Sequence, residues 1–163
     1  MRLVVVGTGY VGLVSGVCLA AKGHYVTCVD INPNVVAKLN KGVPHIYECG
    51  LEELLKDSLN ARQFSATTDL HAGLKTADLV IIAVGTPTRD GVIDLTYVRE
   101  AARSIGAYMK ATGRSLAVVV KSTVVPGTTD TVVKQEIEAA LGLKFPAFGL
   151  GMNPEFLREG EAI

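Results

Sequence analysis

Short runs of consecutive apolar residues, separated by longer amphipathic stretches, recur along the whole chain. The runs at residues 3–6, 79–84 and 116–120 contain no polar side chain. A strand that is apolar on both faces has to be covered on both faces, as in a parallel sheet with helices on either side. The pattern therefore predicts an α/β fold, with a doubly wound parallel sheet in three layers and a single domain spanning residues 1–163.

Glycines, prolines and capping residues between these runs mark the expected elements. We expect strands at residues 3–6, 25–29, 64–67, 79–84, 116–120 and 147–150. We expect helices at residues 11–22, 33–41, 51–59, 94–110 with Asp94 as the cap, and 126–141, together with a short helix capped by Asp69 and a helical turn beginning at Pro154. No Pro-, Gly- or Ser-rich linker divides the chain.

Charge and cysteine content exclude several classes of function. Sixteen Lys and Arg balance 16 Asp and Glu, which leaves no basic footprint for nucleic acid or an anionic membrane. No stretch reaches the roughly 20 apolar residues that a membrane span needs. Cys18, Cys28 and Cys49 lack the spacing of a disulfide framework or a metal site, and the first two suit small buried apolar positions. We therefore expect a cytoplasmic protein that binds no metal.

Residues 7–12 form the pattern Gly-Thr-Gly-Tyr-Val-Gly between a predicted strand and a predicted helix. In that context Gly7 permits a tight turn, Gly9 lets a pyrophosphate approach the backbone, and Gly12 lets the helix pack closely on the sheet. The helix N-terminus offers free N–H groups and a partial positive charge to phosphates. The motif predicts a Rossmann-type dinucleotide site; an ordinary glycine-rich turn is the alternative.

Asp30 closes the second predicted strand, 18 residues after Gly12. An acidic residue about 20 residues beyond the glycines accepts hydrogen bonds from the adenosine ribose in such sites. A carboxylate there repels a 2′-phosphate, so we expect NAD rather than NADP as the cofactor. The alternative is a turn or helix-capping residue.

Two hydroxyl-bearing blocks follow predicted strands. They are residues 84–88 (VGTPT) and the pair Ser122 and Thr123. Ligands bind at the carboxyl ends of parallel strands, so both blocks are candidates for contacts with a nicotinamide or a sugar. A plain turn is the alternative for residues 84–88, and helix capping is the favoured role of Thr128 and Thr129.

A fourth block, residues 153–160 (NPEFLREG), carries two carboxylates. On a helical turn, Glu155 and Glu159 would share one face because they are four residues apart, with Arg158 pointing elsewhere. Such a pair is suited to acid–base chemistry or to holding a water molecule. A charged surface turn is the alternative.

Taken together, the motifs resemble the UDP-glucose/GDP-mannose dehydrogenase family along essentially the entire chain. The blocks that carry the resemblance are residues 7–13 (GTGYVGL), 47–55 (YECGLEELL), 85–88 (GTPT), 122–129 (STVVPGTT) and 153–160 (NPEFLREG). Within the family, the chain looks most like the members that act on UDP-glucose.

The resemblance implies oxidation of a UDP-sugar at C6, from alcohol through aldehyde to carboxylate, with reduction of two NAD molecules and a cysteine thioester on the way. It implies catalytic roles for Thr123 and Glu155 in organising water and protons. The implied cofactor contacts are Gly7, Gly9, Tyr10, Val11, Gly12, Asp30, Gly85, Thr86, Pro87, Ser122, Thr123 and Glu159. The implied substrate contacts are Glu155, Phe156, Leu157, Arg158 and Glu159.

The family's nucleophilic cysteine, catalytic lysine and catalytic aspartate have no match in this sequence. We therefore expect a cofactor-binding domain without the family's central helix and sugar-nucleotide domain, inactive alone and homodimeric in the full-length enzyme. Two departures from the family pattern are Cys49, where Pro is usual, and Val35, where Lys or Arg is frequent. They predict an exposed, oxidisable thiol and weakened affinity for NAD. The alternatives are a GDP-mannose dehydrogenase and a non-catalytic nucleotide-binding regulatory module.

Overall fold

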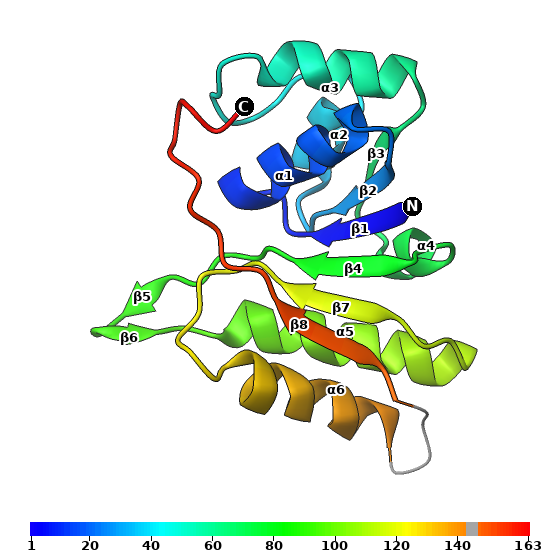
Figure 1. Cartoon of the computed structure of the whole chain (residues 1–163), viewed down its shortest axis with the longest axis vertical. Coiled ribbons are helices and arrows are strands. Elements are labelled where there is room, and N and C mark those ends of the chain that lie inside the picture. Colours follow the sequence, from blue (N-terminus) through cyan, green and yellow to red (C-terminus); the bar gives the residue numbers. More distant parts are fainter. Residues whose placement is uncertain (143–146) are drawn as a thin grey trace.

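A computed structural model describes residues 1–142 and 147–163. Within these residues, six parallel strands form one sheet in the order β3-β2-β1-β4-β7-β8 (Figure 1). The strands are β1 (Arg2–Val6), β2 (Tyr25–Val29), β3 (Phe64–Thr67), β4 (Leu79–Ile82), β7 (Ala117–Val120) and β8 (Gly149–Met152). The predicted doubly wound Rossmann-type sheet is confirmed, and the strand order reverses between β1 and β4.

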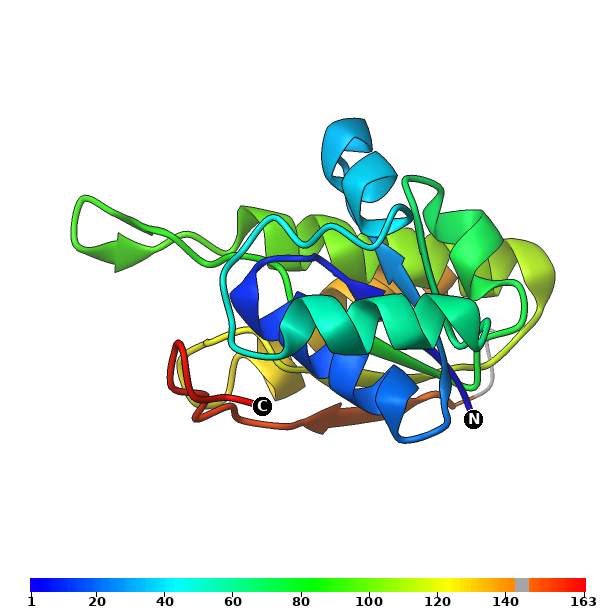
Figure 2. The ribbon, with the colours of Figure 1, turned by 90° about the horizontal axis from the view of Figure 1, so that it is seen from above.

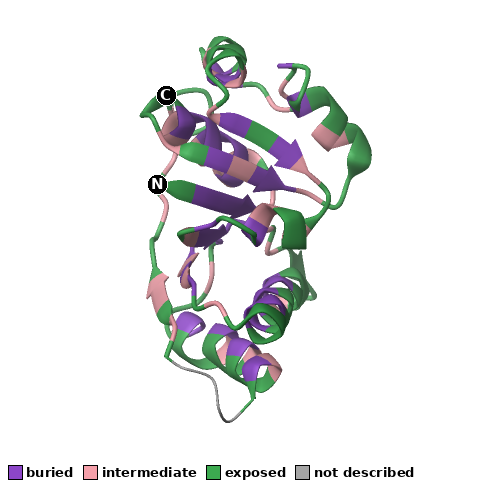
Figure 3. Ribbon diagram, turned by 90° about the vertical axis from the view of Figure 1, so that its right-hand side faces the viewer, coloured by how far each residue is buried: buried purple, intermediate pink, exposed green. Residues whose placement is uncertain are grey.

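Helices cover both faces of the sheet, as the apolar strands required (Figure 1). They are α1 (Tyr10–Ala21), α2 (Pro33–Leu39), α3 (Leu51–Asn60), α4 (Leu70–Leu74), α5 (Thr96–Thr112) and α6 (Lys134–Leu141), with a π-helical turn at Thr129–Val133 before α6. Strand β1 shows the three layers most directly. Val4 and Val6 pack with α5 and α6, whereas Leu3 and Val5 pack with α1 and α3. Buried residues concentrate on the central strands and on the inner sides of the helices (Figure 3).

Three helix boundaries differ from the sequence prediction for identifiable reasons. Helix α2 ends at Leu39, and residues 40–42 continue it as a turn that closes at Gly42, which has a φ of +75° and donates to the Leu39 carbonyl oxygen at 3.0 Å. The helix expected from residue 126 begins only at Thr129, since Gly127 has a φ of +87°, outside the helical region. Asp94 is not the N-cap residue of α5, although its carboxylate accepts a 2.9 Å hydrogen bond from the Thr96 amide.

Several other predictions were wrong. Residues 154–159 form no helical turn and run as an irregular segment. The last strand spans Gly149–Met152 rather than residues 147–150, because its pairing with β7 begins with Gly149 opposite Ala117. A small hairpin of β5 (Thr88–Arg89) and β6 (Val92–Ile93) was not predicted and stands away from the body of the molecule (Figure 2). Among the described residues, no helix is both long and apolar enough to span a bilayer.

Candidate functional site

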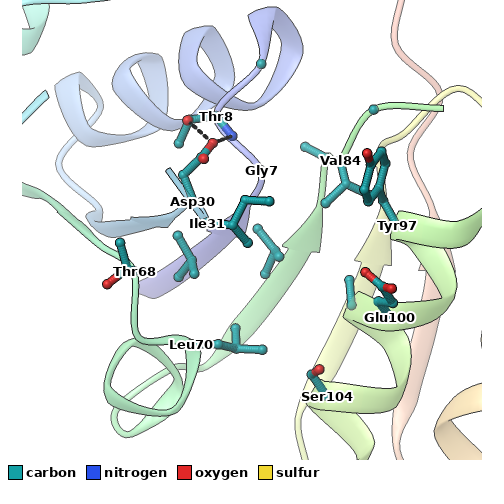
Figure 4. Close-up of a pocket in the computed structure, with 16 residues that line it drawn as sticks. Gly7, Thr8, Asp30, Ile31, Thr68, Leu70, Val84, Tyr97, Glu100 and Ser104 are labelled. Carbon is teal, nitrogen blue, oxygen red and sulfur yellow. Dashed lines mark hydrogen bonds between the residues drawn. The ribbon is translucent and has the colours of Figure 1, made fainter. Parts of the chain in front are cut away.

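A cavity of about 380 Å³ opens at the carboxyl ends of β1 and β4, where the strand order reverses (Figure 4). Such a switch point is where ligands bind in open α/β sheets. Its walls come from β1, β2, α4 and α5, and from the residues that follow β1, β2, β3 and β4. The lining residues include Gly7, Thr8, Gly9, Val29, Asp30, Ile31, Leu70, Ala83, Tyr97, Glu100 and Ser104.

The three glycines of the first motif have separate structural roles. Gly7 has a φ of +97°, in the left-handed region that favours glycine. A Cβ on Gly12 would lie 2.1 Å from the Gly7 carbonyl oxygen, so any side chain there would collide with backbone. A Cβ on Gly9 would meet nothing within 4 Å, which leaves open space in front of the helix. The structure therefore reserves room at Gly9 and close packing at Gly12.

The N-terminus of α1 is suited to an anion. Gly9 is its N-cap residue, no side chain caps the helix there, and its first turn contains no acidic residue. The amides of this first turn, Tyr10 and Val11 among them, consequently lack intrahelical acceptors. These N–H groups and the helix dipole together make this end of α1, beside the cavity, suited to a phosphate.

The Asp30 carboxylate lies in the cavity and supports the glycine loop. One carboxylate oxygen accepts hydrogen bonds from the amide of Thr8, at 3.1 Å, and from its hydroxyl. The other oxygen accepts from the Asn32 amide at 2.9 Å. The two interpretations of Asp30 are thus compatible, because a residue that stabilises the turn also presents a carboxylate to the cavity.

The far wall of the cavity was not predicted. Tyr97, Glu100 and Ser104 project from α5 toward the cavity (Figure 4). Positions three, four and seven apart share one face of a helix, so their common orientation could have been inferred from spacing. Their proximity to Asp30 could not, because it depends on how α5 packs across the sheet.

The two hydroxyl-bearing blocks are brought together at the ends of β4 and β7. The Thr86 hydroxyl donates to the carbonyl oxygen of Thr123 at 2.8 Å. The Ser122 hydroxyl is buried and donates to the Val84 carbonyl oxygen at 2.7 Å. The Ser122 side chain therefore joins the strand ends, while Thr123 is exposed at the same edge.

The segment after β8 begins at this edge too. The Asn153 amide donates to the Val120 carbonyl oxygen at 2.9 Å, and its side chain accepts from the Lys121 ammonium at 2.9 Å. Two residues later, the Glu155 carboxylate accepts a 2.8 Å hydrogen bond from the Leu157 amide. Phe156 is 92% exposed. Without a helix here, Glu155 and Glu159 do not form the predicted pair on one helical face, and Arg158 forms an ion pair with Glu161.

A buried carboxylate that sequence analysis did not single out lies behind the glycine loop. Glu48 is only 6% exposed and accepts hydrogen bonds from the Tyr10 hydroxyl and from the amides of Gly160 and Ala162, the latter two at 2.7 and 3.0 Å. Burial and the bond to Glu48 raise the pKa of Tyr10 to about 12. The same hydrogen bond lowers the pKa of Glu48, and the hydrogen bonds from backbone amides lower it further. The Tyr10 side chain thus points away from the cavity, which leaves its backbone amide for a cofactor contact.

The cysteines occupy different environments. Cys28 is completely buried, and desolvation raises the pKa of its thiol to about 12. Cys18 is half-buried, and burial raises the pKa of its thiol also. Neither is suited to act as a nucleophile. Cys49 is exposed, as predicted. Residues 1–142 and 147–163 contain no group of three side chains placed to hold a metal ion.

The fold and the cavity define the NAD-binding domain of a dehydrogenase. The chain belongs to the UDP-glucose/GDP-mannose dehydrogenase family, whose NAD-binding domain it matches over residues 1–163, and NAD is its cofactor.

Known relatives act on different sugars. UDP-glucose 6-dehydrogenase YwqF of Bacillus subtilis is 40% identical over all of this chain, which covers 36% of that protein. A crystal structure of GDP-mannose dehydrogenase from Pseudomonas aeruginosa superposes with a TM-score of 0.95 at 41% identity, over 99% of this chain and 38% of that one. UDP-glucose dehydrogenase from Pyrobaculum islandicum has a TM-score of 0.88 at 47% identity, over 98% and 37%. The chain therefore spans well under half the length of these relatives.

Proposed function

We propose that this chain is the cofactor-binding part of an enzyme that oxidises UDP-glucose to UDP-glucuronate with two NAD. One observation carries the proposal. The cavity that contains Asp30 lies at the carboxyl edge of the sheet. A second polar group lies along the same edge and consists of Thr86, Thr123 and the segment that carries Glu155. A cofactor at the first and a sugar at the second would lie along one edge.

The residues of the cavity fit NAD. Ile31 and Leu70 offer apolar surface for the adenine, and Asp30 can accept hydrogen bonds from the ribose hydroxyls. The space left by Gly9 and the amides at the start of α1 suit the pyrophosphate. When bound, NAD would supply the acceptor for hydride from the sugar.

The second polar group suits the proton chemistry of the reaction. Thr123 is exposed at the end of β7, and Asn153 is hydrogen-bonded to the same strand end, two residues before Glu155. A carboxylate held there by the Leu157 amide can bind or deprotonate water, with the Thr123 hydroxyl helping to hold it. A purely regulatory nucleotide-binding module would have no use for this arrangement.

The sugar nucleotide is the finer part of the proposal. Identity to the Pyrobaculum islandicum UDP-glucose dehydrogenase, at 47%, exceeds the 41% to the Pseudomonas aeruginosa GDP-mannose dehydrogenase. These residues contribute little to recognition of the base. The UDP-sugar is therefore proposed as the substrate from overall likeness, with a homodimer as the state of the full-length enzyme.

Calorimetry and absorbance at 340 nm test the proposal in two steps. The chain alone should bind NADH more tightly than NADPH and should form no NADH with UDP-glucose. The full-length protein that contains this chain should form two NADH per UDP-glucose. Faster turnover of GDP-mannose would refute the choice of sugar, and NADH binding with no turnover of either sugar would favour a regulatory module.

A further inference from the structure

The segment of residues 153–163 crosses between the two halves of the sheet. Figure 1 shows it leaving β8 and returning past the end of β4 to the neighbourhood of α1 and α3. We call it the strap. Its first end is attached to β7 through Asn153, and its second end is attached to Glu48, as described above. Glu155 and Phe156 lie between these two attachments.

Glu48 also connects the strap to the glycine motif, through Tyr10. The Tyr10 hydroxyl donates to Glu48 and lies 3.1 Å from the carbonyl oxygen of Arg158 in the strap. Tyr10 belongs to the first turn of α1, whose free amides face the pyrophosphate position. One residue therefore has its backbone at the cofactor site and its side chain on the strap.

The chemistry around Glu48 makes this connection specific. The donors that face the carboxylate include the Tyr10 hydroxyl and the amides of Cys49, Gly160 and Ala162. A buried carboxylate with several charge-assisted hydrogen bonds is a strong and directional anchor. A glutamine of the same shape would have one acceptor oxygen, and its NH₂ group would face donors.

We propose that Tyr10 and Glu48 are positioning residues that couple cofactor binding to the order of the strap. Bound NAD would fix the first turn of α1, and Tyr10 would transmit that order to Glu48 and the strap. The link to catalysis rests on the proposed function, in which the strap carries Glu155. By thermodynamic reciprocity, a strap held by Glu48 strengthens NADH binding by the same factor.

Amide hydrogen exchange of the 163-residue chain, resolved at Gly160 and Ala162, tests the coupling. In the wild-type chain, saturating NADH should slow exchange of both amides by at least about threefold. Without NADH, Glu48→Gln should speed exchange of both amides by about tenfold or more. In this variant NADH should no longer protect the two amides, and NADH should bind more weakly by the same factor as the protection that is lost. Tyr10→Phe keeps the hydrogen bonds from the Gly160 and Ala162 amides to Glu48 but removes the hydroxyl that contacts Glu48 and the Arg158 carbonyl oxygen. It should therefore lose most of the protection by NADH with a smaller change in the basal rate.

Two matched controls lie in the same region. Glu52→Gln removes an exposed carboxylate that pairs with Lys56, and Tyr47→Phe removes a hydroxyl from a tyrosine that is 85% exposed. Both should behave as wild type. If Glu48→Gln does not fold, Tyr10→Phe gives the same comparison. NADH binding without protection of the two amides would overturn the coupling alone, whereas absence of NADH binding would overturn the proposed function with it.

Discussion

Gly9 and Gly12 belong to one motif, yet the structure predicts opposite consequences for the same substitution. In Gly12→Ala, the new Cβ would lie 2.1 Å from the Gly7 carbonyl oxygen and 3.2 Å from the Ala83 Cβ. The first of these atoms is backbone, so α1 or the turn would have to move. Overpacking costs about 1–3 kcal/mol, and a collision with backbone places this variant near the upper end.

In Gly9→Ala, the new Cβ would meet no atom of the protein within 4 Å. Gly9 has φ −62° and ψ −174°, values that alanine adopts freely. Loss of glycine at an N-cap costs some helix stability, and reduced freedom of the unfolded chain offsets it, each by about 0.5–1 kcal/mol. The free energy of unfolding should therefore change by less than about 0.5 kcal/mol. NADH affinity should nevertheless fall by at least about tenfold, because the methyl group occupies the approach of the pyrophosphate.

Thermal unfolding and NADH titration of both variants separate the two effects. At about 2–4 °C per kcal/mol for a chain of this size, Gly12→Ala should lower the Tm by about 6–12 °C. Gly9→Ala should leave the Tm within about 2 °C of wild type. Equal loss of stability in both variants, or unchanged NADH affinity in Gly9→Ala, would show that the division of roles between these glycines is mistaken.

Three further predictions concern charged and titrating groups. Asp30→Ala should bind NADPH about as well as NADH, because the carboxylate that repels a 2′-phosphate is gone; calorimetry would refute this if the wild-type chain already bound NADPH equally. Between pH 10 and about 12 the free energy of unfolding should fall, since the unfolded phenol of Tyr10 ionises near 10.0 and the folded one only near 12. Urea unfolding should show a smaller fall for Tyr10→Phe but not for Tyr47→Phe. In the full enzyme, Glu155→Gln should reduce turnover by about 10²- to 10⁴-fold and accumulate a covalent adduct visible by mass spectrometry, while Glu53→Gln should not.

Local pattern was sufficient wherever neighbouring residues specify the structure. The strands at Tyr25–Val29 and Phe64–Thr67 have the predicted bounds, and the cap predicted at Asp69 forms the expected hydrogen bond. The glycine loop was equally predictable, because its φ angle and close packing follow from the absence of side chains at fixed spacing.

Prediction failed where a distant partner competes with a local preference. Asn40, at the end of α2, makes two hydrogen bonds of 2.8 Å with the Ala66 backbone in β3, a contact that a helical pattern alone cannot indicate. Residues 154–159 have carboxylates at helical spacing, but the segment is held at both ends by distant partners. The Asn153 amide bonds to β7 and the Gly160 amide bonds to Glu48. The hairpin at residues 88–93 was missed for a different reason, since its signal is local. Its turn contains Asp90 and Gly91, both with positive φ, and Asp-Gly is a hairpin signal that the sequence does contain.

The sequence by itself determined the parallel sheet, the glycine loop and the acidic residue after the second strand, because each depends on a periodicity or spacing within a short stretch. Only the tertiary structure decided which groups share a site. The α5 side chains opposite Asp30, the joining of Thr86 to Thr123, and the meeting of Glu48 with Gly160 and Ala162 depend on how separate elements pack. Glu48 lies 112 and 114 residues from those two amides. No local propensity encodes a hydrogen bond across such a separation, because the bond forms only when the elements that carry the two partners pack together.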